Sequence, residues 1–321
     1  MAIEKRLQLD IVTPCFNEQE CIELFYDEVR LALDALPLLD YTVYFIDDGS
    51  SDATLAKVLE LEKLHGDKRI RYISFTRNFG KEAAIYAGLR ASTGDYVVLM
   101  DTDLQDPPAL LPRMLKAITD EGYDSVATYR VDRRGEPPVR SWFARLFYRL
   151  MAVSSDLKLQ PGARDYRMMT AGMRDAIVSM GERERFYKGL SAWVGFNTLW
   201  LDYDNIPRAG GVTKWSFWKL FDYAIGGIAA FSTAPLRLAS LLGSLMLAMA
   251  SAYAVFVLSA ALHNKTKPSI TNLLLLFIGG KIILLLGIIG EYIARIYTEV
   301  LNRPLYLVHR TNVDAAADST D

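Results

Sequence analysis

Two long apolar stretches near the C-terminus constrain this chain most strongly. Leu238–Leu262 is 25 residues long and has no charged residue, and Ile270–Gly290 is 21 residues long with one charge, Lys281. An α-helix needs roughly 20 apolar residues to cross a bilayer, whereas core helices of soluble proteins are usually shorter and amphipathic. Because the connector 263–269 is short, we expect the two stretches to form a transmembrane hairpin.

The distribution of positive charge predicts the orientation of this hairpin. Lys and Arg residues flank its outer ends, whereas the connector has only Lys265 and Lys267. Positively charged flanks stay on the cytoplasmic side. We therefore expect a multi-pass protein of the inner membrane, with the bulk of the chain and both termini in the cytoplasm. The first ten residues are charged and have no apolar run, so no signal peptide is predicted.

Residues 8–130 alternate between strand-like and helix-like runs. This pattern predicts an α/β domain with a Rossmann-like, mostly parallel sheet and helices on both faces. The expected strands are Leu9–Thr13, Tyr41–Ile46, Ile70–Phe75, Tyr96–Met100 and Asp124–Thr128, and the expected helices are Glu18–Leu36, Asp52–His65, Lys81–Ala91 and Pro107–Glu121.

The whole chain divides into four predicted parts. Residues 1–210 form the catalytic domain, and 211–235 form a juxtamembrane interfacial helix. Two transmembrane helices, at about 236–262 and 270–292, occupy 236–297, and 298–321 is a cytoplasmic tail. A second basic, aromatic-rich amphipathic segment, 137–153, also suits a membrane surface or a contact with the domain core.

Polar clusters follow four of the expected strands. They are Asn17-Glu18, Asp47-Asp48, Arg77-Asn78 and Asp101-Thr102-Asp103. Each cluster alone is more often a turn or a helix cap, but ligands bind at the carboxyl ends of strands in such sheets. Two carboxylates one residue apart at such an end can share Mg²⁺ or Mn²⁺, which prefer oxygen ligands and leave positions open for phosphate. Such an ion neutralises a diphosphate as it leaves.

Several other classes of protein are disfavoured. The chain has neither a P-loop nor a G-x-G-x-x-G motif, and its three histidines form no Ser-His-Asp arrangement. The net charge of −2 and the absence of a broad basic field argue against nucleic acid as a partner. Cys15 and Cys21 lack a metal-type or redox-type spacing and are expected to be reduced.

These motifs are similar to those of a known family. Ile11–Glu18, Asp47–Asp52 and Asp101–Pro108 resemble the family-two glycosyltransferases of GT-A fold. Four further segments resemble the branch that acts on polyprenyl phosphate, namely bactoprenol glucosyltransferases and, more distantly, dolichol-phosphate mannose synthases. These segments are Arg77–Ala84, Arg185–Leu190, Thr213–Trp215 and Gly290–Tyr297.

The resemblance implies roles for individual residues. Asp103 and Asp165 are the candidate catalytic residues, and in this chain Arg164 replaces the glycine that usually precedes the matching Asp. The nucleotide-binding set is Pro14, Phe16, Glu18, Asp48 and Asp101, and the metal-binding set is Asp101, Asp103 and Gln105. Arginine forks and lysines suit phosphate, and the candidates for the acceptor phosphate are Arg130, Arg133, Arg134, Arg140, Lys188 and Lys214.

Asp165 matches the position of a catalytic base, but the expected acceptor complicates that role. A phosphate ester has its second pKa near ~6, so a lipid phosphate is mostly ionised at neutral pH. Little proton removal is needed before it attacks an anomeric carbon. We therefore expect Asp165 mainly to orient the acceptor or neighbouring cations.

The predicted function is the inverting transfer of a hexose, glucose by resemblance, from a nucleotide-sugar to polyprenyl (undecaprenyl) phosphate. The product would serve the cell envelope, and a UDP-linked donor and a homo-oligomer are expected. Mannose, galactose, GlcNAc and GalNAc remain alternatives, as does a processive polysaccharide synthase. That last class usually has a longer membrane region and a Gln-x-x-Arg-Trp motif, which this chain lacks. A non-catalytic membrane scaffold is a further alternative, against which the intact carboxylate pair argues.

Overall fold

The computed structural model describes residues 6–36, 38–66, 69–130, 159–204, 232, 234–262 and 271–313. The segment 137–153, most of 211–235, and the predicted phosphate-binding residues Arg133, Arg134, Arg140 and Lys214 lie outside these ranges. The expectations for them remain predictions.

A mixed eight-stranded sheet forms the centre of the N-terminal body, in the order β7-β5-β6-β4-β1-β2-β3-β8. Neighbours among β1 to β4 are parallel, as are β5 and β7, whereas β6 runs antiparallel to β4 and β5, and β8 antiparallel to β3. The strands are β1 Leu7–Cys15, β2 Leu39–Asp47, β3 Ile70–Phe75, β4 Tyr96–Leu99, β5 Ser125–Arg130, β6 Ala163–Thr170, β7 Thr198–Tyr203 and β8 Val308–Thr311.

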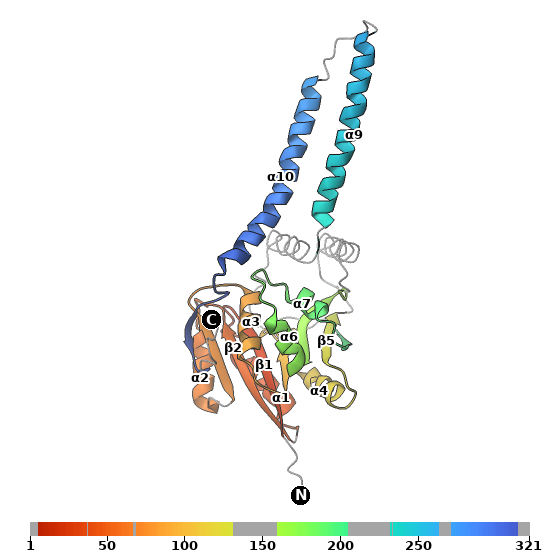
Figure 1. The fold of residues 1–321 in the computed structure, drawn as a ribbon. Helices are drawn as coiled ribbons and strands as arrows, with labels where there is room; N and C mark the ends of the chain where they lie inside the picture. Colours follow the sequence, from red (N-terminus) through yellow and green to blue (C-terminus); the bar gives the residue numbers. More distant parts are fainter. Residues whose placement is uncertain are drawn as a thin grey trace.

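Helices cover both faces of the sheet, as Figure 1 shows. One apolar core joins the sheet to α1 (Ile22–Leu33), α2 (Thr54–His65) and α4 (Leu111–Thr119). The other joins it to α3 (Lys81–Ala91), α6 (Ala171–Ser179) and α7 (Tyr187–Trp193). Helix α3 lies so close to β1 that a Cβ at Gly88 would come within 2.2 Å of Val12 Cγ1. This packing holds α3 directly against β1.

The α/β class and the first strand–helix alternation agree with the sequence prediction, with shifts of a few residues at the element ends. The predicted helix Pro107–Glu121 is divided into a 3₁₀ turn, η1 (Pro108–Leu110), and α4. Pro112 explains the division, because it lacks the N–H that a continuous helix would donate to the carbonyl of Pro108. Just before α2, Asp52 Oδ1 accepts the N–H of Thr54, the first residue of the helix, at 2.9 Å.

Two long helices project together from one end of the body (Figure 1). They are α9 (Ala234–Leu262) and α10 (Thr271–Leu301). Within the described residues, Phe277–Leu301 is the one stretch long and apolar enough to cross a membrane, and none of its apolar window is buried. Large exposed side chains such as Ile283, Leu286 and Ile293 match a membrane environment.

The chain returns to the sheet after α10. Thr76 N–H donates to Leu307 C=O at 3.0 Å, and β8 then pairs with β3. The Tyr306 ring stacks on Phe75, with 4.8 Å between ring centroids. Part of the region assigned to a tail, 298–321, is therefore helix up to Leu301 and an edge strand at Val308–Thr311. An edge strand needs a distant partner, which no local sequence pattern reveals.

Candidate active site

Strand direction places two carboxylates opposite each other. Asp101 directly follows β4, and Asp165 lies near the start of β6. The two strands are antiparallel, with Leu99 paired to Arg167. Continuing this register by two residues sets Asp101 opposite Asp165, although the two are far apart in the sequence.

The turn after β4 is held from both sides. Thr102 Oγ1 donates to Pro14 C=O at 3.1 Å and lies 2.9 Å from Thr13 Oγ1, which fixes the turn to the end of β1. Asp103 Oδ1 accepts the Gln105 N–H at 3.1 Å. Leu104 has φ +57°, a conformation that costs energy for a bulky residue and is typical of functional turns. These contacts set Asp101, Asp103 and Gln105 around one tight turn.

The carboxylate of Asp106, which is buried, stabilises this turn through hydrogen bonds. Its Oδ2 accepts the Asp101 N–H at 3.3 Å, and its Oδ1 accepts the Tyr203 hydroxyl at 2.7 Å and Arg164 Nε at 3.3 Å. Asp106 is fully buried, so these donors compensate the cost of its desolvation. Arg164 thus lies in the extended backbone of β6 and pairs with Asp106, in place of the glycine usual at this position.

Asp48, which directly follows β2, binds the loop that follows β3. Its carboxylate accepts the N–H of Phe79 at 2.7 Å and that of Gly80 at 3.0 Å. Burial raises the pKa of Asp48 to about 6, although these two hydrogen bonds oppose the shift. Gly49, at φ +66°, has no room for a side chain, because a Cβ would come 2.4 Å from the Arg77 backbone. Pro14, Phe16 and Glu18, all half-buried, lie at and after the end of β1.

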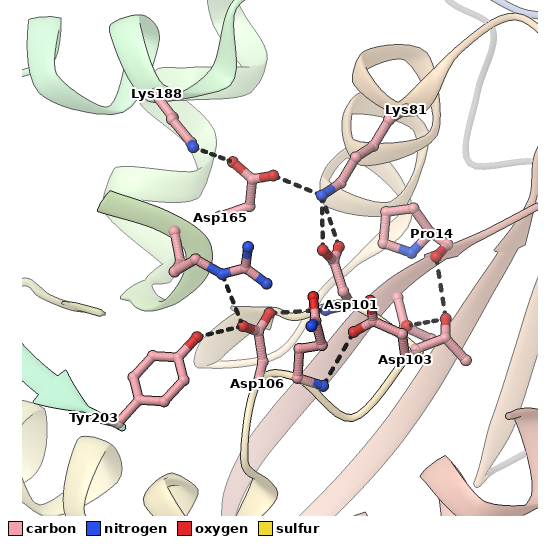
Figure 2. A network of polar contacts seen from close by, with 12 residues as sticks. Pro14, Lys81, Asp101, Asp103, Asp106, Asp165, Lys188 and Tyr203 are labelled. Atoms are coloured by element: carbon pink, nitrogen blue, oxygen red, sulfur yellow. Dashed lines mark hydrogen bonds and ion pairs between the residues drawn. The ribbon is translucent and has the colours of Figure 1, made fainter. Parts of the chain in front are cut away.

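Asp165 lies between two lysines (Figure 2). Lys81 Nζ is 2.6 Å from Asp165 Oδ2, and Lys188 Nζ is 3.9 Å from Asp165 Oδ1. Lys81 Nζ also lies 2.7 Å from Asp101 Oδ1. Burial works to raise the pKa of Asp165, but the charges of Lys81 and Lys188 prevail and hold the pKa well below its usual range. Asp165 is therefore an ion-paired carboxylate with weak basicity.

The predicted site residues are only partly brought together within the described structure. Lys188, on α7, reaches Asp165. Arg130 ends β5, on the far side of β6 from β4. The nucleotide and metal candidates lie along the ends of β1, β2 and β4. Their roles remain predictions.

Comparisons with known proteins agree with this geometry. The model of "Glycosyl transferase family 2" matches residues 10–179, more than half of the chain, and that of the "GtrB C-terminal hairpin" matches 234–296. The chain belongs to glycosyl transferase family 2. This confirms the family predicted from the motifs, the enzyme class and the GT-A-like fold with a C-terminal hairpin, and it supports association with a membrane.

Individual relatives of this family 2 enzyme match along almost its whole length. It is 37% identical over 305 residues to an uncharacterized glycosyltransferase, sll0501, of Synechocystis, covering 94% of this chain and 95% of the relative. It is 36% identical over 307 residues to a prophage bactoprenol glucosyl transferase homolog of Escherichia coli K12, covering 95% and 99%. A solved structure of glucosyl-3-phosphoglycerate synthase from Mycobacterium tuberculosis matches at 22% identity with a TM-score of 0.47, covering 70% of this chain and 78% of that one.

Sequence reasoning gave no role in this glycosyltransferase to Lys81, Asp106, Arg164 or Tyr203. Lys81 carried one usable signal. It is the first residue of α3, where a cation opposes the helix dipole and therefore needs another reason to be present. Arg164 and Tyr203 carried no such signal, because their contact with Asp106 depends on the pairing of β5, β6 and β7.

The donor atoms at the turn suit a divalent ion only in part. Asp101 and Asp103 offer carboxylates and Gln105 an amide oxygen, which are hard ligands suited to Mg²⁺ or Mn²⁺. In the described part of the chain, no group of three or more His, Cys, Asp or Glu side chains can enclose a metal. The residues therefore fit an ion whose remaining ligands are phosphate oxygens and water, bound together with a nucleotide.

Proposed function

We propose that this enzyme transfers glucose from a nucleotide-sugar, UDP-glucose, to polyprenyl phosphate at the cytoplasmic face of the inner membrane. Relatives from Escherichia coli K12 and Shigella phage SfX, both 36% identical over almost the full chain, are named as a bactoprenol glucosyl transferase homolog and a bactoprenol glucosyl transferase. The hairpin supplies the membrane anchor that a lipid acceptor requires.

The ion-paired state of Asp165 is the observation that best supports a phosphate group as the acceptor. A neutral sugar hydroxyl must lose a proton as it attacks, and it needs a free general base. Asp165 is held by Lys81 at 2.6 Å and has a lowered pKa, so it is poorly suited to accept that proton. A phosphate acceptor is already ionised, and the lysines beside Asp165 complement its charge.

The reaction follows as a single in-line displacement. An oxygen of the lipid phosphate forms a bond to the anomeric carbon while the bond from that carbon to the donor diphosphate breaks. The nucleoside diphosphate leaves with the electron pair, and the anomeric configuration inverts. Asp165 positions the lysines, and Lys188 together with Arg130, Arg133, Arg134, Arg140 and Lys214 forms the proposed phosphate-binding set.

The donor side is assigned to the ends of β1, β2 and β4. Pro14, Phe16, Glu18, Asp48 and Asp101 are the proposed nucleotide contacts. Asp101, Asp103 and Gln105 would hold Mg²⁺ or Mn²⁺, which when bound neutralises charge on the leaving diphosphate. We propose that the active unit is a homo-oligomer with both termini in the cytoplasm.

A donor panel tests this function. Purified enzyme is incubated with undecaprenyl phosphate and UDP- or GDP-linked glucose, galactose, mannose, GlcNAc or GalNAc, and lipid products are identified by mass spectrometry. We expect one hexose per lipid, from UDP-glucose only, and loss of the product when metal is chelated. Asp103→Asn should lower the rate by about 100-fold or more, whereas the exposed control Asp27→Asn should not.

If another donor gives the lipid product, the sugar of that donor would replace glucose in the proposal. Polymer instead of a monosaccharide-lipid would favour a processive synthase. If none of the donors is turned over, the result would favour the non-catalytic scaffold.

A further inference from the structure

The placement of Lys81 is set by the donor side of the site. Lys81 opens α3 directly after Gly80, whose φ is +101°. The N–H groups of Phe79 and Gly80 donate to Asp48, so this carboxylate fixes the loop that presents Lys81. A cation in the first turn of a helix is unfavourable, because it opposes the positive end of the helix dipole. Helix stability therefore does not explain a lysine at this position.

The Lys81 ammonium links two carboxylates that have different proposed roles (Figure 2). Its Nζ lies 2.7 Å and 3.0 Å from the two oxygens of Asp101 and 2.6 Å from Asp165 Oδ2. Asp101 belongs to the metal and nucleotide side, whereas Asp165 also faces Lys188. The Lys81 side chain is 31% exposed, so a ligand entering the site can reach it.

Lys81 and a divalent ion compete for the same carboxylate. A metal bound at Asp101 would lie within a few ångströms of the ammonium, and the repulsion between the two cations is strong at that range. The incoming substrates bring compensating charge, because the donor carries a diphosphate and the acceptor a phosphate. An ammonium that loses Asp101 can then gain a phosphate oxygen, so the local charge stays balanced.

We propose that Lys81 is a phosphate-binding residue that the ligand-free enzyme holds between Asp101 and Asp165, and that it moves from Asp101 to a phosphate oxygen when donor and metal bind. The proposal rests on the proposed function for the identity of the phosphates. The oxygen belongs either to the donor diphosphate or to the lipid phosphate. In both cases Lys81 weakens metal binding before the nucleotide arrives.

The first test is Mn²⁺ binding to purified protein without nucleotide, followed by electron paramagnetic resonance. Lys81→Met should bind Mn²⁺ about tenfold more tightly than the wild type, because a competing cation is removed from Asp101. Lys57→Met is the matched control, since Lys57 lies on the surface of α2 and pairs there with Glu60 and with Glu23 of α1. Unchanged or weaker Mn²⁺ binding by Lys81→Met, with its thermal unfolding intact, would overturn the proposal.

The second test identifies the phosphate. Steady-state kinetics of Lys81→Met should show a KM raised about tenfold for one substrate. A rise for UDP-glucose assigns the oxygen to the donor diphosphate, and a rise for undecaprenyl phosphate assigns it to the lipid. If both KM values stay within about twofold of the wild type while Mn²⁺ binds more tightly, Lys81 is only a counter-ion for Asp101 and the proposal fails.

These tests separate the role of Lys81 from the lipid acceptor. If Lys81→Met is inactive, calorimetry of UDP binding with Mn²⁺ replaces the kinetics. Weaker UDP binding then supports a donor contact. Unchanged UDP binding, together with an unchanged affinity for undecaprenyl phosphate in detergent, contradicts the proposal. The Mn²⁺ titration needs no acceptor. If the wild-type enzyme does not use undecaprenyl phosphate, the proposed function fails, but the Mn²⁺ result for Lys81 still stands by itself.

Discussion

At the scale of single residues, Asp165 shows how an environment decides the chemistry of a side chain. By position it matches a catalytic base, but Lys81 at 2.6 Å and Lys188 at 3.9 Å hold it ionised. Each lysine needs a counter-ion when the substrate is absent, and Asp165 serves both. A carboxylate of this kind positions cations, whereas proton transfer would require a basicity that it lacks.

This role predicts the pH dependence of an Asp165 variant. Because the pKa of Asp165 lies below its usual range, the group stays ionised from about pH 5 to about pH 9, and its ion pairs weaken only at a pH below the range in which an ordinary aspartate titrates. Asp165→Asn should lower kcat by roughly 100-fold through misplaced lysines, by a factor that does not shrink as the pH rises. Asp175→Asn is the control, because Asp175 is exposed and pairs only with its neighbour Arg174 among the described ion pairs. Recovery of the Asp165→Asn rate at high pH would instead identify a true base.

At the scale of elements, the sequence predicted best what local patterns determine. The runs Ile70–Phe75 and Lys81–Ala91 form the strand and helix expected of them, because apolar spacing alone specifies each. Strands β6, β7 and β8 were not predicted, since their stability depends on partners distant in the chain. Asp101 and Asp165 face each other because of the antiparallel register between β4 and β6, so this geometry could not be predicted from the sequence either.

Strand β8 offers a direct test of one such distant partner. Asn312 follows β8, and its side chain accepts the Tyr72 N–H at 2.8 Å and donates to Ile70 C=O at 3.0 Å and to Glu62 at 2.9 Å. Asn312→Ala should destabilise the protein by about 1–3 kcal/mol, because part-buried groups lose their partners. Thermal unfolding and limited proteolysis after α10 measure this effect, with the exposed Asn197→Ala as control. Equal stability of the two variants would show that β8 contributes little.

Helix α10 contains one charge in its apolar stretch, Lys281. Its Nζ lies 4.5 Å from the ring centre of Phe277, one turn earlier in the same helix. No acidic residue lies in Leu238–Leu262, so we expect Lys281 to face a protein interior, either within the hairpin, where the hydroxyls of Ser251 and Tyr253 could accept hydrogen bonds, or at a subunit contact. The cation–π contact within α10 satisfies part of its charge, and the subunit contact stays a prediction.

Lys281→Leu tests whether Lys281 contributes to assembly and stability or is only tolerated by the bilayer. A buried charge near the middle of a membrane costs roughly 2.5–3.5 kcal/mol on insertion scales, so it persists only where it contributes something. Lys281→Leu should weaken assembly or lower thermal stability in detergent, measured by size-exclusion chromatography with light scattering and by thermal unfolding. Lys281→Arg, which keeps the charge, is the control. Unchanged assembly, stability and activity would leave only a lysine that the bilayer tolerates.

At the scale of the whole molecule, the N-terminal body is joined to the base of helix α10 at more than one place. Arg295 on α10 pairs with Glu184, and Arg183 bonds to Asn302 and to the carbonyl of Arg303. The same short region leads into α7, which carries Lys188. Together with β8, these contacts fix the base of α10 relative to the carboxylates and lysines of the site. This arrangement suits an enzyme whose donor is soluble and whose acceptor lies in the membrane.

The anomeric configuration of the lipid product tests this account most directly. Purified enzyme, UDP-glucose and undecaprenyl phosphate are combined, and the product is analysed by proton and phosphorus NMR. We predict one glucose joined through a phosphodiester to each lipid, with the configuration at the anomeric carbon opposite to that of the donor. Retained configuration, or release of free glucose without a lipid product, would contradict a direct displacement by the lipid phosphate.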